Sequence, residues 1–167
     1  MQPKECLDNI INPTLRLMEQ RAGIPYNAHA ANLLLAIALQ ESNLSARIQG
    51  PNDAGPARGF WQFEKIGVAD MLARQRHPLQ IMCSALVLPF EAGKLHLMLA
   101  YNDAMACVLA RLTLRVDPRP IPTTSAPHEP WEYYIRNWRP GKPHRDRWDG
   151  RSWPVACATT GVFMAQG

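Results

Sequence analysis

One stretch of the sequence constrains the fold more than any other. Residues 28–41 read Ala-His-Ala-Ala-Asn-Leu-Leu-Leu-Ala-Ile-Ala-Leu-Gln-Glu, a run rich in strong helix formers. Apolar residues fall on almost every side of such a helix, so it must be surrounded by protein. Asn27 directly precedes the run and is a favoured N-cap residue. The sequence therefore predicts a central, buried helix from Asn27 to about Glu41.

The remainder of residues 1–117 also has the pattern of helices joined by short turns. Asn12 followed by proline predicts a helix start with its cap at Asn12, and Gly23 predicts its end. Helical patterns are expected over residues 12–21, 65–75, the residues after Pro78, and 93–115. The Gly- and Pro-rich residues 43–59 predict a loop. Few stretches alternate with period two, so the fold class expected is all-α.

The composition changes after Val116. Eight of the 15 prolines and four of the five tryptophans fall within residues 118–154. This proline content predicts extended chain with one short helix near residues 131–138. A linker would be polar, whereas large aromatic side chains are normally buried. We therefore expect residues 118–167 to pack on the helical body of residues 1–117 within the same domain, and not to form a mobile tail.

Size and charge narrow the class of protein. A chain of 167 residues suits one domain, and 47% hydrophobic with 19% charged residues excludes a disordered chain. The net charge of +4 favours an anionic polymer such as nucleic acid, lipopolysaccharide or cell wall. No apolar run approaches the roughly 20 residues that span a bilayer. We expect a monomer that does not insert into membranes.

Neither the cysteines nor the histidines are spaced as metal ligands. The four cysteines include no Cys-x-x-Cys pair, and the five histidines follow no ligand pattern. We therefore expect no metal and no cofactor.

Three short motifs follow one another in a fixed order. Residues 40–42 (Gln-Glu-Ser) end the predicted buried helix, and residues 59–64 (Gly-Phe-Trp-Gln-Phe-Glu) follow the loop. Residues 100–102 (Ala-Tyr-Asn) lie in the last long helical region. Together they resemble the lytic transglycosylase branch of the lysozyme-like superfamily, over about residues 28–115. Residues 138–143 (Trp-Arg-Pro-Gly-Lys-Pro) resemble small phage or prophage proteins of this type.

The resemblance implies a lysozyme-like helical fold and cleavage of peptidoglycan at the β-1,4 bond between N-acetylmuramic acid and N-acetylglucosamine. Its catalytic residue would be Glu41, which protonates the leaving oxygen as positive charge develops on the sugar. A carboxylic acid does this near neutral pH when burial raises its pKa. In the family the same glutamate then acts as a base toward the sugar's own 6-hydroxyl. The product is a 1,6-anhydro sugar, and no second carboxylate is required.

The resemblance also assigns supporting roles. Tyr101 would donate a hydrogen bond that orients Glu41, and Ser42 would support the helix end. The residues expected to line the cleft or bind substrate are Phe60, Trp61, Gln62 and Asn102.

Two departures from the family pattern keep the reaction type open. Phe60 and Trp61 replace a Leu-Met pair, and Asp103 with Ala104 replaces the usual Ala-Gly after the third motif. Two carboxylates, those of Glu64 and Asp103, therefore lie near the motifs, and that of Asp53 lies in the intervening loop. If one lies roughly 5–9.5 Å from Glu41, ordinary muramidase hydrolysis is also available.

Two other classes of function compete with the enzyme. A lysozyme-like fold can serve a non-catalytic wall-binding or phage structural protein, because fold does not dictate activity. Residues 136–151 hold six Lys or Arg interleaved with Trp138 and Trp148, which suits stacking on nucleic acid. No recognised nucleic-acid module accompanies them, which weakens this alternative. The partner that the resemblance implies is bacterial peptidoglycan.

The start of the sequence and the basic segment suggest a setting. No export signal is visible, as expected of a phage protein made in the host cytoplasm. It would reach the cell wall after release at lysis or as a virion component. Arg136, Arg139 and Lys142 would lie near the groove and attract the carboxylates of the peptide stems of the wall.

Overall fold

The computed structural model describes residues 1–50 and 55–164, and these residues are predominantly helical. They contain only isolated β-bridges, Ile48 with Arg58 and Arg58 with Phe63. The prediction of an all-α fold is confirmed. In chain order the helices are α1 (Pro3–Cys6), η1 (Leu7–Ile11), α2 (Asn12–Ala22), α3 (Ala28–Ser42), α4 (Lys65–Arg74), α5 (Arg76–Ala85), α6 (Ala92–Met98), α7 (Asp103–Val116), α8 (His128–Trp138), α9 (Arg145–Arg147), η3 (Trp148–Ser152) and α10 (Trp153–Thr160).

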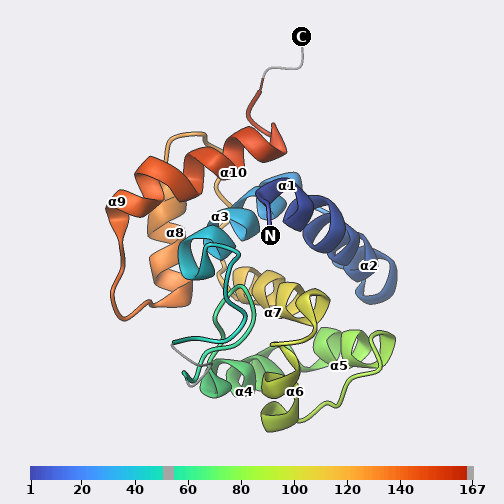
Figure 1. The fold of residues 1–167 in the computed structure, drawn as a ribbon. Coiled ribbons are helices and arrows are strands. Elements are labelled where there is room, and N and C mark those ends of the chain that lie inside the picture. The colour runs from blue at the N-terminus through green and yellow to red at the C-terminus, as the bar shows by residue number, and fades with distance from the viewer. Residues whose placement is uncertain (51–54, 165–167) are drawn as a thin grey trace.

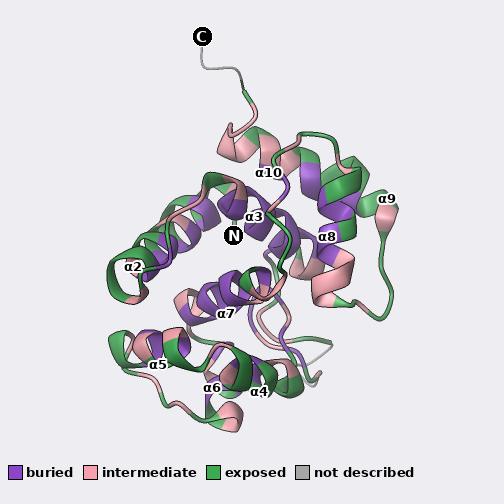
Figure 2. Cartoon of the chain, turned by 180° about the vertical axis from the view of Figure 1, so that it is seen from behind, coloured by how far each residue is buried: buried purple, intermediate pink, exposed green. Residues whose placement is uncertain are grey.

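Helix α3 is the buried centre of the molecule, as the sequence predicts. Every residue from Ala30 to Gln40 is buried, and the Asn27 side chain accepts a hydrogen bond of 2.8 Å from the Ala30 amide. Helices α8 to α10 cover one side of α3, while α7 lies on the other side and contacts α2, α4 and α5 (Figure 1). Buried residues are concentrated along α3 and α7 (Figure 2).

The N-terminal helical region begins earlier than predicted. The chain is helical from Pro3 to Ala22, so Asn12 lies inside it and is not a cap, whereas Gly23 ends it in the left-handed conformation. Proline in an α-helix clashes with the carbonyl four residues earlier. For Pro13, this carbonyl belongs to η1, and for Pro154 it belongs to η3. Both segments are π-helices, which are wider than an α-helix. This widening explains how helical backbone continues through both prolines.

The helix predicted over residues 93–115 is broken in two. Helices α6 and α7 meet at an angle of 119°, with residues 99–102 between them. The Asn102 side chain caps α7 by accepting a hydrogen bond of 2.9 Å from the Met105 amide. Among the described residues, no single helix has both the length and the apolar character of a membrane span, and α6 and α7 meet those criteria only as this bent pair.

The C-terminal segment packs against the helical body, as its aromatic content predicts. Its buried aromatic residues are Trp131, Tyr133, Tyr134, Trp148 and Trp153. Two of the buried indoles keep a hydrogen bond, because Trp148 donates to the Pro127 carbonyl and Trp153 to the Ser125 carbonyl. The sequence prediction of a single short helix here is wrong, since residues 145–160 form a second helical stretch that packs on α3.

Candidate active site

A cleft with a volume of about 810 Å³ lies beside the C-terminal end of α3. One wall comes from α8 and the segment that follows it, residues 139–147. The opposite wall comes from residues 62–71, which include the start of α4. Glu41 lines the cleft from the last turn of α3, so the predicted acid lies in a concave site.

The carboxyl group of Glu41 is half-buried and hydrogen-bonded. The Tyr134 hydroxyl donates to Oε1 of Glu41 at 2.6 Å. Burial raises the pKa of Glu41 above its ordinary value, while the Tyr134 hydrogen bond and the positive charge of Arg147 act in the opposite direction. The net effect favours the protonated acid, which is the form that can donate a proton.

The C-terminal segment holds the end of α3 that carries Glu41. Buried Gln40 donates from Nε2 to the His144 carbonyl at 3.0 Å and accepts at Oε1 from the Ser152 hydroxyl at 2.8 Å. Arg147 donates to the Gln40 carbonyl at 3.3 Å, which supplies a partner for a carbonyl of the last helical turn. These contacts hold in place the last turn of α3, which carries Glu41.

Ser42 also stabilises this helix end, in agreement with its predicted role. Its hydroxyl donates to the Ala38 carbonyl at 3.1 Å and accepts from the Leu44 amide at 3.2 Å. Asn43 adopts the left-handed conformation at the C-cap, with a φ of 53°. The chain therefore turns sharply away just after Glu41 and leaves its carboxyl group facing the cleft.

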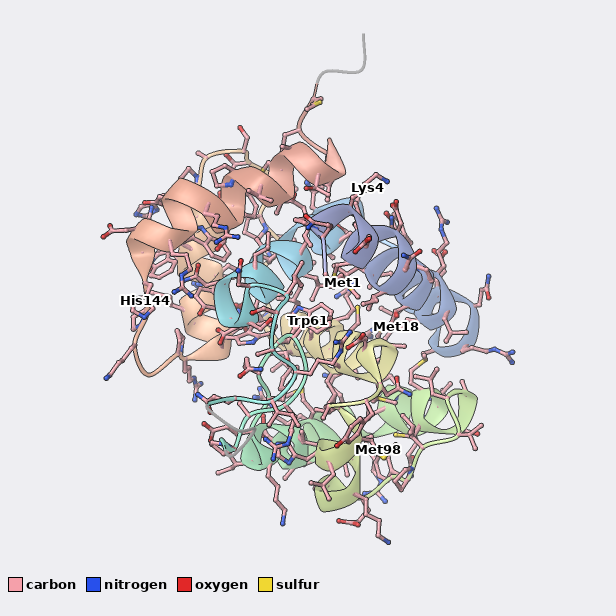
Figure 3. All side chains as sticks on the ribbon, viewed as in Figure 1. Met1, Lys4, Met18, Trp61, Met98 and His144 are labelled. Atoms are coloured by element: carbon pink, nitrogen blue, oxygen red, sulfur yellow. The ribbon has the colours of Figure 1, made fainter. Side chains whose placement is uncertain are left out.

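The aromatic wall of the cleft is not the one predicted. Phe60 and Trp61 are fully buried and face the core instead of the cleft (Figure 3 labels Trp61 in the interior). The indole of Trp61 donates to the Leu34 carbonyl at 2.9 Å. The aromatic residues that line the cleft instead include Phe63 from one wall and Trp138 from the other, and the two walls meet at this pair, with ring centroids 6.0 Å apart.

A tight turn explains why Phe60 and Trp61 face the core and not the cleft. Arg58 and Phe63 exchange two backbone hydrogen bonds of 2.9 Å, so residues 59–62 form the turn between them. Gly59 has a φ of 73°, and a Cβ there would lie 2.9 Å from that of Ala106. The turn directs residues 60 and 61 inward. Gln62 adopts a φ of 53° and lines the cleft, as predicted.

The third motif does not contribute to the cleft. Tyr101 is 80% exposed and does not line it, so the predicted hydrogen bond from Tyr101 to Glu41 is wrong. The break between α6 and α7 turns Tyr101 toward solvent. The side-chain oxygen of Asn102 caps α7, and Asn102 does not line the cleft either.

Tyr134 takes the role that the sequence assigned to Tyr101. Tyr134 was expected to be buried as one of the aromatic residues of the C-terminal segment, but not to contact the acid. The sequence shows only that Tyr134 lies in an aromatic-rich helix around residues 131–138. This position predicts that Tyr134 is buried, but it does not identify Glu41 as its hydrogen-bond partner.

The candidate second carboxylates differ in their surroundings. Glu64 is exposed and lines the cleft. Asp103 is excluded from it, because Arg47 binds both of its oxygens at 2.8 and 2.7 Å. Asp53 lies outside the described residues. Asp70 of α4 also lines the cleft and was missed by the sequence analysis.

Of the three basic residues expected near the groove, two line the cleft and one does not. Arg139 and Lys142 line the cleft. Arg136 does not, because its guanidinium binds Asp117 at 2.7 Å and lies over the ring of Tyr133. Arg147 lines the cleft in addition.

Metal binding has no visible basis in residues 1–50 and 55–164. They contain no group of three His, Cys, Asp or Glu side chains arranged to hold an ion. The arrangement beside α3 offers acid–base chemistry from the half-buried carboxyl group of Glu41.

The chain matches no protein-family profile, and no curated protein or solved structure is significantly similar to it. The resemblance to lytic transglycosylases therefore rests on the three sequence motifs alone. Of the motif residues, Gln40 and Glu41 of the first motif and Gln62, Phe63 and Glu64 of the second line the cleft.

Proposed function

We propose that this protein cleaves the glycan strand of bacterial peptidoglycan, with Glu41 as the general acid. The observation that carries the proposal is a half-buried carboxyl group in a large cleft, with a raised pKa and a tyrosine hydroxyl 2.6 Å away. Groups with perturbed pKa values in clefts are candidates for acid–base catalysis. A lysozyme-like fold is part of this proposal.

The geometry supports a specific division of labour within the carboxyl group. Oε1 of Glu41 accepts the hydrogen bond of Tyr134, so the transferable proton is assigned to Oε2. Oε2 would protonate the glycosidic oxygen as the bond to the anomeric carbon breaks. The positive charge of Arg147 then stabilises the carboxylate that is left.

The carboxylate formed in this step can act next as a base. In a lytic transglycosylase it would accept the proton of the sugar's 6-hydroxyl as that oxygen bonds to the anomeric carbon. This reaction consumes no water, and Glu41 returns to its protonated form. A muramidase would instead activate a water molecule with a second carboxylate. Of the carboxylates predicted for this role, Glu64 lines the cleft.

Digestion of purified cell-wall sacculi, followed by mass spectrometry of the fragments, tests the proposal. Ends lighter than reducing ends by one water would establish transglycosylase chemistry. Reducing ends would establish hydrolysis and assign a role to Glu64. The Glu41→Gln protein serves as the control and should release no fragments.

The absence of fragments from wild-type protein at every pH tested would refute the enzymatic proposal. Retained binding to sacculi would then support a wall-binding protein. Binding to single-stranded DNA that weakens steeply with salt, without binding to sacculi, would support the nucleic-acid alternative.

A further inference from the structure

The cleft has two walls of opposite charge. Arg139, Lys142 and Arg147 line the wall that follows α8, and all three are exposed. None of them forms an ion pair with the described residues, whereas neighbouring Arg145 binds Asp149 at 2.6 Å. Three cations that form no salt bridge with the described residues thus lie on one side of the cleft, and Arg147 among them also lies close enough to Glu41 to lower its pKa.

The segment that presents these cations is tied to the protein at both ends. At its start, the Trp138 indole donates to the Trp61 carbonyl at 3.2 Å. Near its end, the His144 carbonyl accepts from Gln40, and Figure 3 shows His144 at the periphery between α8 and α9. The cations are therefore held at a defined edge of the cleft, although their own side chains reach into solvent.

The opposite wall is acidic. Glu64 immediately precedes α4 and forms no ion pair among the described residues, and Asp70 contacts only Arg74, at 3.4 Å. The carboxylates of Glu64 and Asp70 make this wall a poorer surface for a polyanion such as nucleic acid than the basic wall is. A ligand that carries both carboxylates and an amino group fits the two walls together.

We propose that Arg139, Lys142 and Arg147 form a subsite for the carboxylates of the peptide stems attached to the glycan strand. The inference rests on the proposed function and adds to it the part of the substrate that the C-terminal segment recognises. Stem peptides carry carboxylates and, in their diamino acid, an amino group that matches the wall of Glu64 and Asp70. The protein would then prefer peptide-bearing strands over bare glycan.

The double variant Arg139→Gln/Lys142→Gln tests this inference. Arg147 is left intact, because it also contacts the helix end that carries Glu41. The matched control is Arg21→Gln/Lys94→Gln, which removes the same charge outside the cleft. Each protein is assayed on peptide-bearing glycan strands and on the same strands after amidase has removed the stems.

We expect the ratio of kcat/KM on peptide-bearing strands to kcat/KM on bare strands to fall about fivefold in the cleft variant, as the loss of two exposed charge contacts predicts. The control variant should keep the wild-type ratio. An unchanged ratio in the cleft variant, or an equal loss on both substrates, would overturn the inference.

A binding measurement separates this inference from the proposed function. If wild-type protein cleaves neither substrate, the proposed function fails, and calorimetry with a soluble disaccharide–tetrapeptide still decides the subsite. Weaker binding by the cleft variant than by the control would support it. Equal binding by both variants, or tighter binding of wild-type protein to single-stranded DNA than to the disaccharide–tetrapeptide, would refute it.

Discussion

The hydroxyl of Tyr134 donates a 2.6 Å hydrogen bond to the carboxyl group of Glu41, across 93 positions of sequence. Glu41 ends the central helix α3, and Tyr134 belongs to α8 of the proline- and tryptophan-rich segment. The candidate site is therefore shared between the two halves of the chain. The predictions below test this pairing and the contacts that maintain it.

Glu41→Gln should abolish cleavage of sacculi. Glutamine keeps the shape and an oxygen that can accept from Tyr134, but it has no transferable proton. General acid catalysis contributes about 10²–10⁴-fold, so the rate of fragment release should fall by that factor. The matched control is Glu132→Gln, which changes an exposed glutamate outside the cleft and should retain most activity. More than about a tenth of wild-type activity in Glu41→Gln would assign the acid elsewhere.

The same substitution should stabilise the protein above pH 5. Because burial raises the folded pKa of Glu41, the folded state holds its proton more tightly than the unfolded chain does. Wild-type stability therefore declines as pH rises above the unfolded value of about 4.3, until the folded pKa is passed. The Tm of Glu41→Gln relative to wild type should rise as pH increases above about 4.3 and become constant above the folded pKa of Glu41. A pH-independent difference in Tm would contradict the raised pKa.

Tyr134→Phe should lower activity about three- to tenfold and shift its pH dependence, because it removes the hydrogen bond that positions the Glu41 carboxyl group. Loss of this bond raises the pKa of Glu41 further, since the bond favours the carboxylate. Activity requires the protonated acid, so the decline at high pH should move to higher pH. Rates of sacculus digestion measured across pH give this profile.

Tyr133→Phe is the control for this experiment. The Tyr133 hydroxyl donates to the Leu114 carbonyl at 2.8 Å and does not line the cleft. Both variants lose one tyrosine hydroxyl bond, but only Tyr134→Phe should shift the pH profile. Equal profiles for the two variants would show that Tyr134 acts through stability alone.

Asp117→Asn should destabilise the junction between α7 and α8. Asp117 binds Arg136 at 2.7 Å and Asn137 at 2.9 Å, and its side chain is 3% exposed. Burial alone would raise the pKa of Asp117, but hydrogen bonds from Arg119 and Asn137 and the charge of Arg119 lower it overall. We expect a loss of about 1–3 kcal/mol in the free energy of unfolding in urea at pH 7.

The sign of the Asp117 effect can be checked by pH. A lowered folded pKa gives stability that is fully present above the unfolded value of about 3.9 and is lost as pH falls through the folded pKa. The difference between Asp117→Asn and wild type should therefore shrink in acid. The control Asp8→Asn removes an exposed pair with Lys4 and should change stability by less than about 0.5 kcal/mol.

Truncation after Val116 should abolish cooperative unfolding. It removes α8 to α10, exposes the side of α3 that α10 covers, and deletes Tyr134. Calorimetry should show no cooperative transition, or the protein should aggregate. A soluble product with a sharp transition would mean that residues 1–116 fold alone.

A point substitution tests the same packing more gently. Trp148 is fully buried and stacks on Tyr134 with ring centroids 5.1 Å apart. Trp148→Ala should lower the free energy of unfolding by about 3–5 kcal/mol. Exposed Arg151 lies on the same segment, and Arg151→Ala should change it by less than about 0.5 kcal/mol.

The sequence by itself determined the features that depend on local pattern. The apolar run after Asn27 is the buried helix, and Gly23 ends α2 in the left-handed conformation. Glu41 lies at the end of that buried helix, where the order of residues places it. The Asn27 cap, the Gly23 helix end and the all-round burial of α3 are encoded within a few neighbouring residues, so they could be predicted without the fold, whereas the predicted cap at Asn12 could not be checked in that way and is wrong.

Only the tertiary structure decided which side chains surround Glu41. Trp61 faces the core because Gly59 packs against Ala106 and fixes the turn, a fit that no local pattern contains. Tyr134 contacts the acid, and Tyr101 does not, because α8 docks on α3 while the α6–α7 break turns Tyr101 outward. The direction of a turn side chain and the partner of a buried hydroxyl depend on contacts between residues far apart in sequence. Those contacts exist only when the helices have packed.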